Sequence, residues 1–258
     1  MGDTWGVMTL GVLQARMTSS RLPGKVLAPL NGEPMIVRQL QRLDRVKGMT
    51  EVVVATSVDS SDDALVDVVT AHGWPVVRGP LDDVLGRFAQ VIRDYGPDVV
   101  VRLTADCPLV SPSVADLVIE RFHSGEYDYV SNTLTPSFPD GLDVEVVTAQ
   151  ALTWLAEQTV DPHEREHVTL GVYRRPEVFS LLNVLGSEDL SALRWTVDTT
   201  ADLEFVRTIY ERLYSENPEF EIWDVLRLIE QDPSLNRTSA DLPRNAALTG
   251  LDTGAMQL

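Results

Sequence analysis

Short apolar runs alternate with amphipathic segments along the first half of the chain. The apolar runs are rich in valine and leucine, which is typical of buried strands. They predict strands over 10–13, 51–56, 75–78 and 98–104. Apolar residues recur between them at helical spacing and predict helices at about 34–46, 62–72, 82–95 and 112–122. Because strands separated by helices need crossover connections, this half predicts a mostly parallel sheet.

The pattern becomes less regular after residue 125. Strands are predicted over 127–131, 143–147, 179–184 and 193–197, and helices near 149–157, 164–173, 201–214 and 222–230. We expect this half to extend the sheet and to add a small mixed β segment. From residue 233 to residue 258 the apolar periodicity is lost, which predicts a loose tail or an arm that docks on a partner.

Length and composition exclude several classes of protein. Of the 258 residues, 44% are hydrophobic and 23% are charged, as in an ordinary soluble globular domain. No apolar run approaches the ~20 residues of a membrane span. The N-terminus lacks a basic region followed by a long apolar one, so we expect no secretory signal. The one cysteine, Cys107, cannot form an internal disulfide, which fits a cytoplasmic location.

The charge of the chain is acidic but unevenly distributed. The formal net charge of −18 argues against nucleic acid and anionic membranes as partners, because both would be repelled. Residues 11–50 nevertheless carry seven basic side chains against two acidic ones. The later four are expected on a solvated helix face: Arg38, Arg42, Arg45 and Lys47. The earlier three predict an anion site in a loop: Arg16, Arg21 and Lys25.

That loop follows the first predicted strand and has the parts of a phosphate cradle. Its sequence, GVLQARMTSSRLPGKVL, contains neither a Walker A motif nor a G-x-G-x-x-G fingerprint. Arg16 and Arg21 can each give two hydrogen bonds to phosphate oxygens, and Lys25 supplies a mobile point charge. Gly24 allows the backbone to approach a ligand closely. The residues alone therefore predict a site for a nucleoside diphosphate or triphosphate.

The same loop resembles a known family. Its run A-R-x-x-S-S-R-L-P-G-K, from Ala15 to Lys25, is similar to the signature of cytidylyltransferases. Those of the spore coat polysaccharide biosynthesis protein F (SpsF) type are most similar, together with 3-deoxy-manno-octulosonate cytidylyltransferases. Further matches follow in the expected order: DDVLGRF, RLTADCPL, GLDVEV, HEREHVT and TVDTTADLE. The resemblance covers residues 10–214, about four fifths of the chain.

The resemblance implies both a fold and a reaction. The fold is α/β, with a doubly wound, mostly parallel sheet of the nucleotide-diphospho-sugar transferase type. One nucleotidyltransferase domain would span 1–232, with a nucleotide-binding half at about 8–125 and an acceptor-binding half at about 126–232. It would transfer CMP from CTP to a small acceptor (a sugar acid, a sugar or a phosphonate) and release pyrophosphate. Two alternatives stay open: a glycosyltransferase that uses a nucleotide-sugar donor, and a non-catalytic nucleotide-binding protein.

Two aspartates follow apolar strands and are candidate metal ligands. Asp106 comes after the run VVVRLT, and Asp198 after LRWTV. The carboxyl ends of parallel strands share one edge of a sheet, where such folds bind ligands. The resemblance makes both aspartates ligands of Mg²⁺, a hard cation that prefers carboxylate oxygens. From the residues alone, Asp106 can instead cap a turn and Asp198 a helix. Without a cation, two adjacent carboxylates would repel each other.

The resemblance also assigns roles to single residues. It places catalysis on Arg16, Arg21, Lys25 and Asp106. The nucleotide would lie against Leu13, Ala15, Arg16, Ser20, Arg21, Lys25, Arg87 and Thr104. On its own, Arg87 is also typical of a solvated helix charge. Cys107 has no base nearby in the sequence, so we expect a small buried thiol rather than a nucleophile.

The second half contains charged residues that the resemblance places at the acceptor pocket. Asp140, Asp143 and Glu145 put three carboxylates into six residues, and the segment HEREH follows. Acceptor binding is assigned to Glu145, His163 and Arg165, with helix packing and capping as the alternative. The segment also matches the zinc-protease pattern H-E-x-x-H, but a proline precedes it and no third ligand is placed, so no zinc is expected. Because relatives of this fold commonly pair, we expect a homodimer built through second-half segments.

Overall fold

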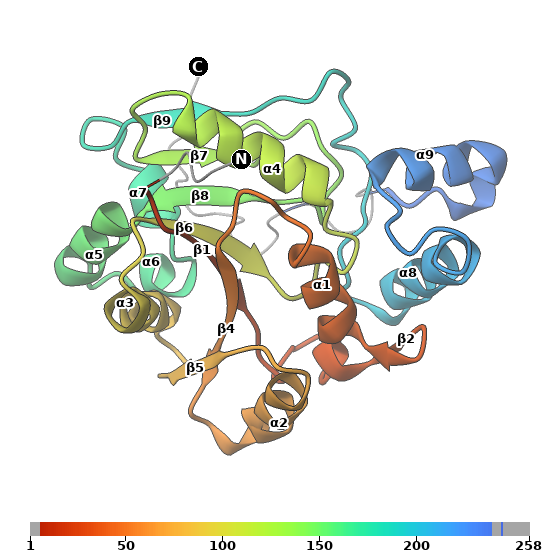
Figure 1. The fold of residues 1–258 in the computed structure, drawn as a ribbon, viewed down its shortest axis with the longest axis horizontal. Coiled ribbons are helices and arrows are strands. Elements are labelled where there is room, and N and C mark those ends of the chain that lie inside the picture. Colours follow the sequence, from red (N-terminus) through yellow and green to blue (C-terminus); the bar gives the residue numbers. More distant parts are fainter. Residues whose placement is uncertain (1–5, 239–243, 245–258) are drawn as a thin grey trace.

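The centre of the molecule is a seven-stranded sheet with the strand order β5-β4-β1-β6-β8-β7-β9 (Figure 1). The computed structural model describes residues 6–238 and 244. The strands of this sheet are β1 Thr9–Gln14, β4 Glu51–Ser57, β5 Val76–Gly79, β6 Val99–Thr104, β7 Tyr129–Ser131, β8 Glu145–Thr148 and β9 Leu181–Asn183. Neighbours among β5, β4, β1 and β6 are parallel, whereas β8 runs antiparallel to both β6 and β7. The predicted α/β fold, with a mostly parallel sheet and a small mixed extension, is confirmed.

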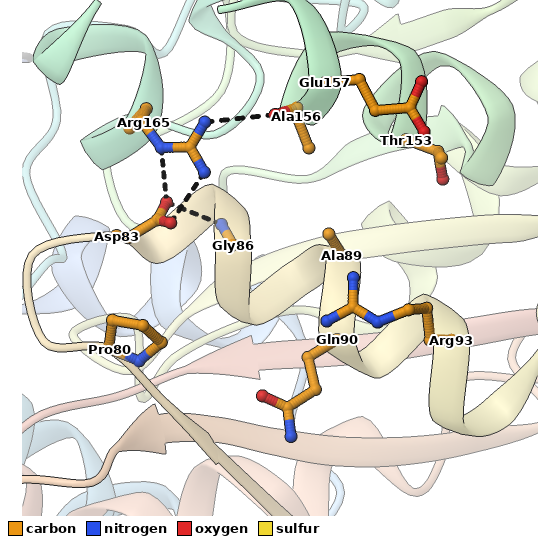
Figure 2. Close-up of a pocket in the computed structure, with 10 residues that line it drawn as sticks. All are labelled: Pro80, Asp83, Gly86, Ala89, Gln90, Arg93, Thr153, Ala156, Glu157 and Arg165. Atoms are coloured by element: carbon orange, nitrogen blue, oxygen red, sulfur yellow. Dashed lines mark hydrogen bonds and ion pairs between the residues drawn. The ribbon is translucent and has the colours of Figure 1, made fainter. Parts of the chain in front are cut away.

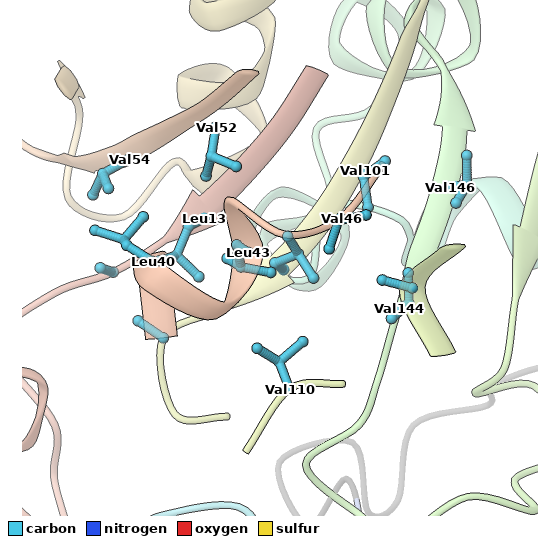
Figure 3. Packing of buried hydrophobic residues seen from close by; sticks show 14 of the residues in the cluster. Leu13, Leu40, Leu43, Val46, Val52, Val54, Val101, Val110, Val144 and Val146 are labelled. Carbon is cyan, nitrogen blue, oxygen red and sulfur yellow. The ribbon is translucent and has the colours of Figure 1, made fainter. Parts of the chain in front are cut away.

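Helices cover both faces of this sheet. The helices of the described residues are α1 Met35–Leu43, α2 Asp63–Ala71, α3 Val84–Tyr95, α4 Pro112–His123, α5 Ala149–Gln158, α6 Pro162–Glu166, α7 Leu170–Tyr173, α8 Thr200–Leu213 and α9 Ile222–Gln231. Of these, α8 and α9 do not lie on the sheet but pack in a separate cluster around Trp195. Alternate strand residues face opposite sides, so Leu13 packs with α1, α2 and α4 while Val12 packs with α3, α5 and α7. Figure 3 shows the first of these layers, where Leu40 of α1 lies among the valines of the sheet. No helix in the described part of the chain is long and apolar enough to cross a membrane.

Two predicted elements differ from the structure. The prediction of a strand over 193–197 is wrong, because this segment pairs only through single bridges, Arg194 with Asp140 and Leu193 with Thr238. The predicted helix over 164–173 is split into α6 and α7. The break lies at Val168, which has a left-handed backbone with a φ of 51°, a conformation that a β-branched residue rarely adopts. Both differences lie in the half of the chain where the apolar pattern is irregular.

The first residues after α9 contact the body of the molecule. Pro233–Leu235 forms a short 3-10 helix, η3. Thr238 bridges Leu193, and the side chain of Arg244 donates hydrogen bonds to the Phe138 carbonyl and to the Asp143 carboxylate. The prediction of a loose tail therefore does not hold for 233–238, while 239–243 and 245–258 lie outside the described residues.

Arg42 lies inside the protein, which corrects the expectation of a solvated position. Its side chain is 4% exposed and donates hydrogen bonds to the carbonyls of Val110, at 2.7 Å, and Phe220, at 2.8 Å. The guanidinium group also stacks on the Phe220 ring, 4.3 Å from its centre. Arg42 thus ties α1 to the segment that leads into α9. Lys47, by contrast, is exposed as expected.

We expect Arg42→Ala to lower the free energy of unfolding by about 2–4 kcal/mol, because two buried carbonyls lose their donor and a cavity opens. Chemical denaturation followed by circular dichroism measures this change. Lys47→Ala removes the same charge at an exposed position and should shift the free energy of unfolding by no more than ~0.5 kcal/mol. Equal effects of the two substitutions would contradict the role of Arg42.

Candidate active site

The loop between β1 and α1 is fixed at its start and near its end. The amide of Met17 donates a hydrogen bond of 2.7 Å to the carboxylate of Asp62, which is fully buried. The amide of Gly24 closes the loop on the Met17 carbonyl, at 2.9 Å. Gly24 has a φ of 74°, a left-handed conformation that favours glycine. Lys25 follows directly and opens the 3-10 helix Lys25–Leu27 (η1), so its position is set by these contacts.

The ammonium group of Lys25 brings together the two candidate metal ligands. Its Nζ lies 3.0 Å from Asp198 Oδ1 and 3.5 Å from Asp106 Oδ2, and it donates a 2.6 Å hydrogen bond to the Val197 carbonyl. Lys25 is only 8% exposed. Residues 25, 106 and 198 therefore meet at one point although they are far apart in sequence. The role of the two aspartates as metal ligands stays a prediction.

Backbone contacts hold the segment before Asp198 against two loops. The amide of Val197 donates to the Asp106 carbonyl at 2.8 Å, and the amide of Trp195 donates to the Asp140 carbonyl at 2.6 Å. Gly141, with a φ of 111°, lies so close that a Cβ there would be 2.6 Å from the Thr196 nitrogen. The segment 193–197 is thus placed by loops rather than by a neighbouring strand.

Asp198 does not cap the following helix. The N-cap of α8 is Thr199, whose side chain accepts from the Asp202 amide in a capping box. Asp202 in turn accepts hydrogen bonds from the amides of Asp198, at 3.1 Å, and Thr199, at 2.9 Å. The carboxylate of Asp198 is left to interact with cations, so the alternative reading of Asp198 as a cap is wrong.

Three cations surround the carboxylate of Asp198. Besides Lys25, the guanidinium groups of Arg21 and Arg194 each lie 2.8 Å from Asp198 Oδ2. Burial alone would raise the pKa of Asp198, but the charge of Lys25 and the hydrogen bonds from Arg21, Lys25 and Arg194 hold it well below its usual range. Asp198 is therefore ionised at neutral pH. The expected repulsion between the two aspartates is already relieved by these side chains.

Asp106 is oriented by the residue two positions before it. Thr104 Oγ1 donates a 2.6 Å hydrogen bond to Asp106 Oδ1. No backbone amide among the described residues is recorded as a donor to this carboxylate, so the turn-capping alternative has no support. The side chain of Asp106 is 30% exposed, so a ligand can reach it. Cys107 is buried beside it, and burial together with the charge of Asp106 raises the pKa of the thiol well above its usual value.

The proposed acceptor residues do not contact this cluster. Glu145 accepts hydrogen bonds from Tyr129, at 2.6 Å, and from Thr169, at 2.5 Å, and it pairs with Arg102. His163 is exposed; its backbone amide donates to Asp161 and its carbonyl accepts from the His167 amide. Glu145 thus has a full set of internal partners, whereas the His163 side chain makes no hydrogen bond or ion pair with any described residue. Their roles in acceptor binding stay predictions.

Arg165 lies at a cavity apart from the Lys25 cluster, shown in Figure 2. Its guanidinium group binds both carboxylate oxygens of Asp83, at 2.9 and 2.7 Å, and the carbonyls of Ala156 and Thr159. The cavity has a volume of about 470 Å³ and lies between α3, α5 and α6. No residue of the Lys25 cluster lines it. Arg165 therefore joins α6 to the start of α3, and its predicted contact with the acceptor has no support in this arrangement.

The H-E-x-x-H pattern does not gather further ligands. His163 lies in α6, and His167 caps the end of that helix. In the described ranges, no three side chains of His, Cys, Asp or Glu come together in a way that could hold a metal ion. The same holds for Asp106 and Asp198, so any metal bound there must take its other ligands from substrate or water.

Several buried charges near the site were not predicted. Arg194 is 4% exposed and pairs with Asp140, Asp198 and Asp202, at 3.0, 2.8 and 3.3 Å. Arg244 pairs with Asp143. Burial nevertheless raises the pKa of Asp143 to about 6. The sequence around Arg194 carries no motif that marks it. The sequence indicates a cation here only indirectly. Several carboxylates lie close together in the GLDVEV region, and such a group needs a cation nearby.

The remaining predicted nucleotide residues lie around the loop. Leu13 and Ala15 are buried at the end of β1, where the Ala15 amide donates to the Ala55 carbonyl, and Ser20 is exposed. Arg16 is half exposed and lies 3.8 Å from Glu166. Arg87 is buried in the first turn of α3. Of these residues only Arg16 and Arg87 are basic, and the role of each residue in nucleotide binding stays a prediction.

Comparison with known proteins first defines the class of fold. A solved cytidylyltransferase from Leptospira borgpetersenii superimposes with a TM-score of 0.85 at 30% identity, covering 90% of this chain and 97% of that one. A CMP:2-keto-3-deoxy-manno-octonic acid synthetase superimposes with a TM-score of 0.61 at 20% identity, over 80% of this chain and 99% of that one. The fold is therefore of the nucleotide-diphospho-sugar transferase type.

Sequence comparison then gives the family. The family model for cytidylyltransferases matches residues 10–231. The spore coat polysaccharide biosynthesis protein SpsF of Bacillus subtilis is 33% identical over 87% of this chain and 95% of its own length. The 3-deoxy-manno-octulosonate cytidylyltransferase of Chlorobium chlorochromatii is 30% identical, with 80% and 98% covered. The chain belongs to the cytidylyltransferase family, which confirms the resemblance and the predicted class of reaction.

We expect Cys107 to react with iodoacetamide at pH 8 at least ~10-fold more slowly in the folded protein than in urea, because burial and the Asp106 charge keep the thiol protonated. Mass spectrometry of timed samples measures the rate. A native rate equal to that of the unfolded chain would show that Cys107 is an exposed, reactive thiol instead.

Proposed function

We propose that this protein transfers CMP from CTP to a hydroxyl group of a small acceptor, with Lys25, Asp106 and Asp198 at the reaction centre. The observation that supports this most directly is the contact of one buried ammonium group with both carboxylates. It lies beside a basic loop at the end of a parallel sheet, where folds of this kind bind nucleotides. No feature of the site favours a nucleotide-sugar donor or a purely non-catalytic role.

The reaction asks mainly for positioning and charge neutralisation. The acceptor oxygen forms a bond to the α-phosphorus of CTP, the bond from this phosphorus to the bridging oxygen breaks, and the electron pair leaves with pyrophosphate. The acceptor proton passes to solvent. Arg16, Arg21 and Lys25 would hold the phosphate oxygens in line with the incoming oxygen and stabilise the developing charge.

The two aspartates fit a magnesium ion. Asp198 is held ionised, and Asp106 is partly exposed with only a long 3.5 Å contact from Lys25 to its Oδ2. Oxygen donors of this kind suit Mg²⁺, which keeps water and phosphate oxygens as further ligands. When bound by Asp106 and Asp198, the ion would neutralise charge on the phosphate oxygens. Thr104 would keep the Asp106 carboxylate in place, and Arg194 would do the same for Asp198.

The acceptor is proposed to be a sugar acid. Relatives named for 3-deoxy-manno-octulosonate and for its 8-amino derivative support this class. In the GLDVEV segment, Asp143 is the carboxylate that would accept hydrogen bonds from sugar hydroxyls, because its side chain is 27% exposed whereas Glu145 is occupied by internal partners. We further propose that residues 1–232 act as one domain, that the protein is a cytoplasmic homodimer, and that the chain beyond 232 is an accessory segment.

We expect CTP with Mg²⁺ to raise the melting temperature more than ATP, GTP or UTP with Mg²⁺, because a ligand that binds the folded state stabilises it. Pyrophosphate release should then require both CTP and an acceptor, tested with 3-deoxy-manno-octulosonate and its 8-amino derivative. A preference for UTP or for a nucleoside-diphosphate sugar would overturn the proposal in favour of a glycosyltransferase.

We expect Asp106→Asn and Asp198→Asn each to lower turnover by at least ~100-fold, the scale of losing a charge-stabilising group. The double variant should be little worse than the poorer single one, because groups that act as a unit are not additive. Asp198→Asn should also lower the melting temperature, because Lys25, Arg21 and Arg194 lose their shared partner. Asp94→Asn, an exposed change of equal charge, is the control. Full activity of Asp198→Asn would restrict the metal site to Asp106.

A further inference from the structure

Arg87 is a buried arginine without a partner. It is 2% exposed, and its Nε and Nη1 atoms are buried with no hydrogen-bond acceptor. No ion pair or hydrogen bond of its side chain occurs among the described residues. Other buried arginines differ, since Arg42 bonds two carbonyls and Arg194 pairs with three carboxylates. A guanidinium group is charged at any physiological pH, so a buried one without an acceptor is strongly unfavourable.

The acidic groups near Arg87 are bound to other partners. Asp83, at the N-cap of α3, accepts hydrogen bonds from Nε and Nη2 of Arg165, as Figure 2 shows. Asp62 accepts hydrogen bonds from the Met17 amide and from Thr56 and Ser57. Both carboxylates therefore act on Arg87 through space, and neither gives it a hydrogen bond.

A second cation lies close to Arg87. Arg16 and the start of the Arg87 helix both contact α6, because Glu166 lies 3.8 Å from Arg16 while the preceding Arg165 binds Asp83, the N-cap of α3. Burial lowers the pKa of Arg87, and the like charge of Arg16 lowers it further. Among the described residues, the acidic contact of Arg16 is Glu166 at 3.8 Å, and both side chains are about half exposed. Such an exposed pair contributes little. In the part of the chain that the structure describes, Arg16 and Arg87 are thus two neighbouring positive charges that no hydrogen-bonded carboxylate neutralises.

We propose that Arg16 and Arg87 form an anion subsite for the β- and γ-phosphates of the nucleotide, the part that leaves as pyrophosphate. This assignment rests on the proposed function. Lys25 and Arg21 already pair with the carboxylates at which the α-phosphorus must react. The leaving group gains negative charge as the bond breaks, so it suits the uncompensated pair. A neutral nucleobase in the same place would leave both charges uncompensated.

The test measures binding of inorganic pyrophosphate, CMP and CTP by titration calorimetry. Arg87→Met keeps much of the side-chain volume without the charge, and Arg16→Gln changes an exposed loop residue that does not threaten the fold. Each substitution should lower the affinity for pyrophosphate and for CTP at least ~10-fold and change the affinity for CMP by no more than about twofold. Arg93→Met is the matched control, because Arg93 is exposed on the same helix and should change nothing.

Thermal melting gives an independent readout. Without ligand, Arg87→Met should melt no lower than the wild-type protein, because an unpaired buried charge is removed; pyrophosphate should stabilise the wild type more than the variant. Unchanged pyrophosphate affinity in both variants overturns the subsite, as does a loss confined to CMP, which would assign Arg87 to the nucleoside. Wild-type protein that binds pyrophosphate but not CTP keeps the subsite and overturns the proposed function. Wild-type protein that binds neither overturns both.

Discussion

The ammonium group of Lys25 lies where the two halves of the chain meet, and the geometry of the candidate site depends on it. Its bonds to Asp198 and the Val197 carbonyl come from the second half, whereas Lys25 follows the loop after β1. The segment before Asp198 does not pair as a strand of the sheet. Its amides instead donate hydrogen bonds to the carbonyls of Asp106 and Asp140. A buried ammonium group is stable only when acceptors surround it. The contacts of Lys25 therefore hold together the end of β6, the loop after β1 and the start of α8.

Ion pairs in this site fix the charged side chains before any substrate arrives. Arg21, Lys25 and Arg194 hold Asp198, and Thr104 holds Asp106. Groups held in place in this way do not have to reorganise when charge develops on a phosphate. The chain is acidic, with a net charge of −18, yet Arg21, Lys25 and Arg194 gather at this site, where the proposed function would bring in a polyanionic nucleotide.

The sequence predicts the first half of the fold well, because each buried strand there is a continuous apolar run between helices. It also predicts that Asp106 follows β6 and that the basic loop follows β1. It does not show that 193–197 pairs with loops, since apolar residues that face a loop look like those that face a strand. The sequence also does not predict the burial of Arg42 and Arg194. A cation is buried only where carbonyls or carboxylates from elsewhere in the sequence accept its hydrogen bonds.

The candidate residues differ in whether their charged groups have partners within the protein, and this distinguishes them better than their position in a motif. Glu145 and Arg165 lie in family motifs, yet their polar atoms already have partners within the protein, so they support neighbouring elements. Lys25 and Asp198 are also paired, but they are paired with each other beside the partly exposed Asp106, where, under the proposed function, a phosphate and a cation would take the place of these contacts. Arg87 is the opposite case, since the fold buries its charge without an acceptor. Burying a guanidinium group without a hydrogen-bond acceptor lowers the stability of the fold unless a bound ligand supplies the acceptor. Arg87 is therefore the residue of the site that says most about what binds there.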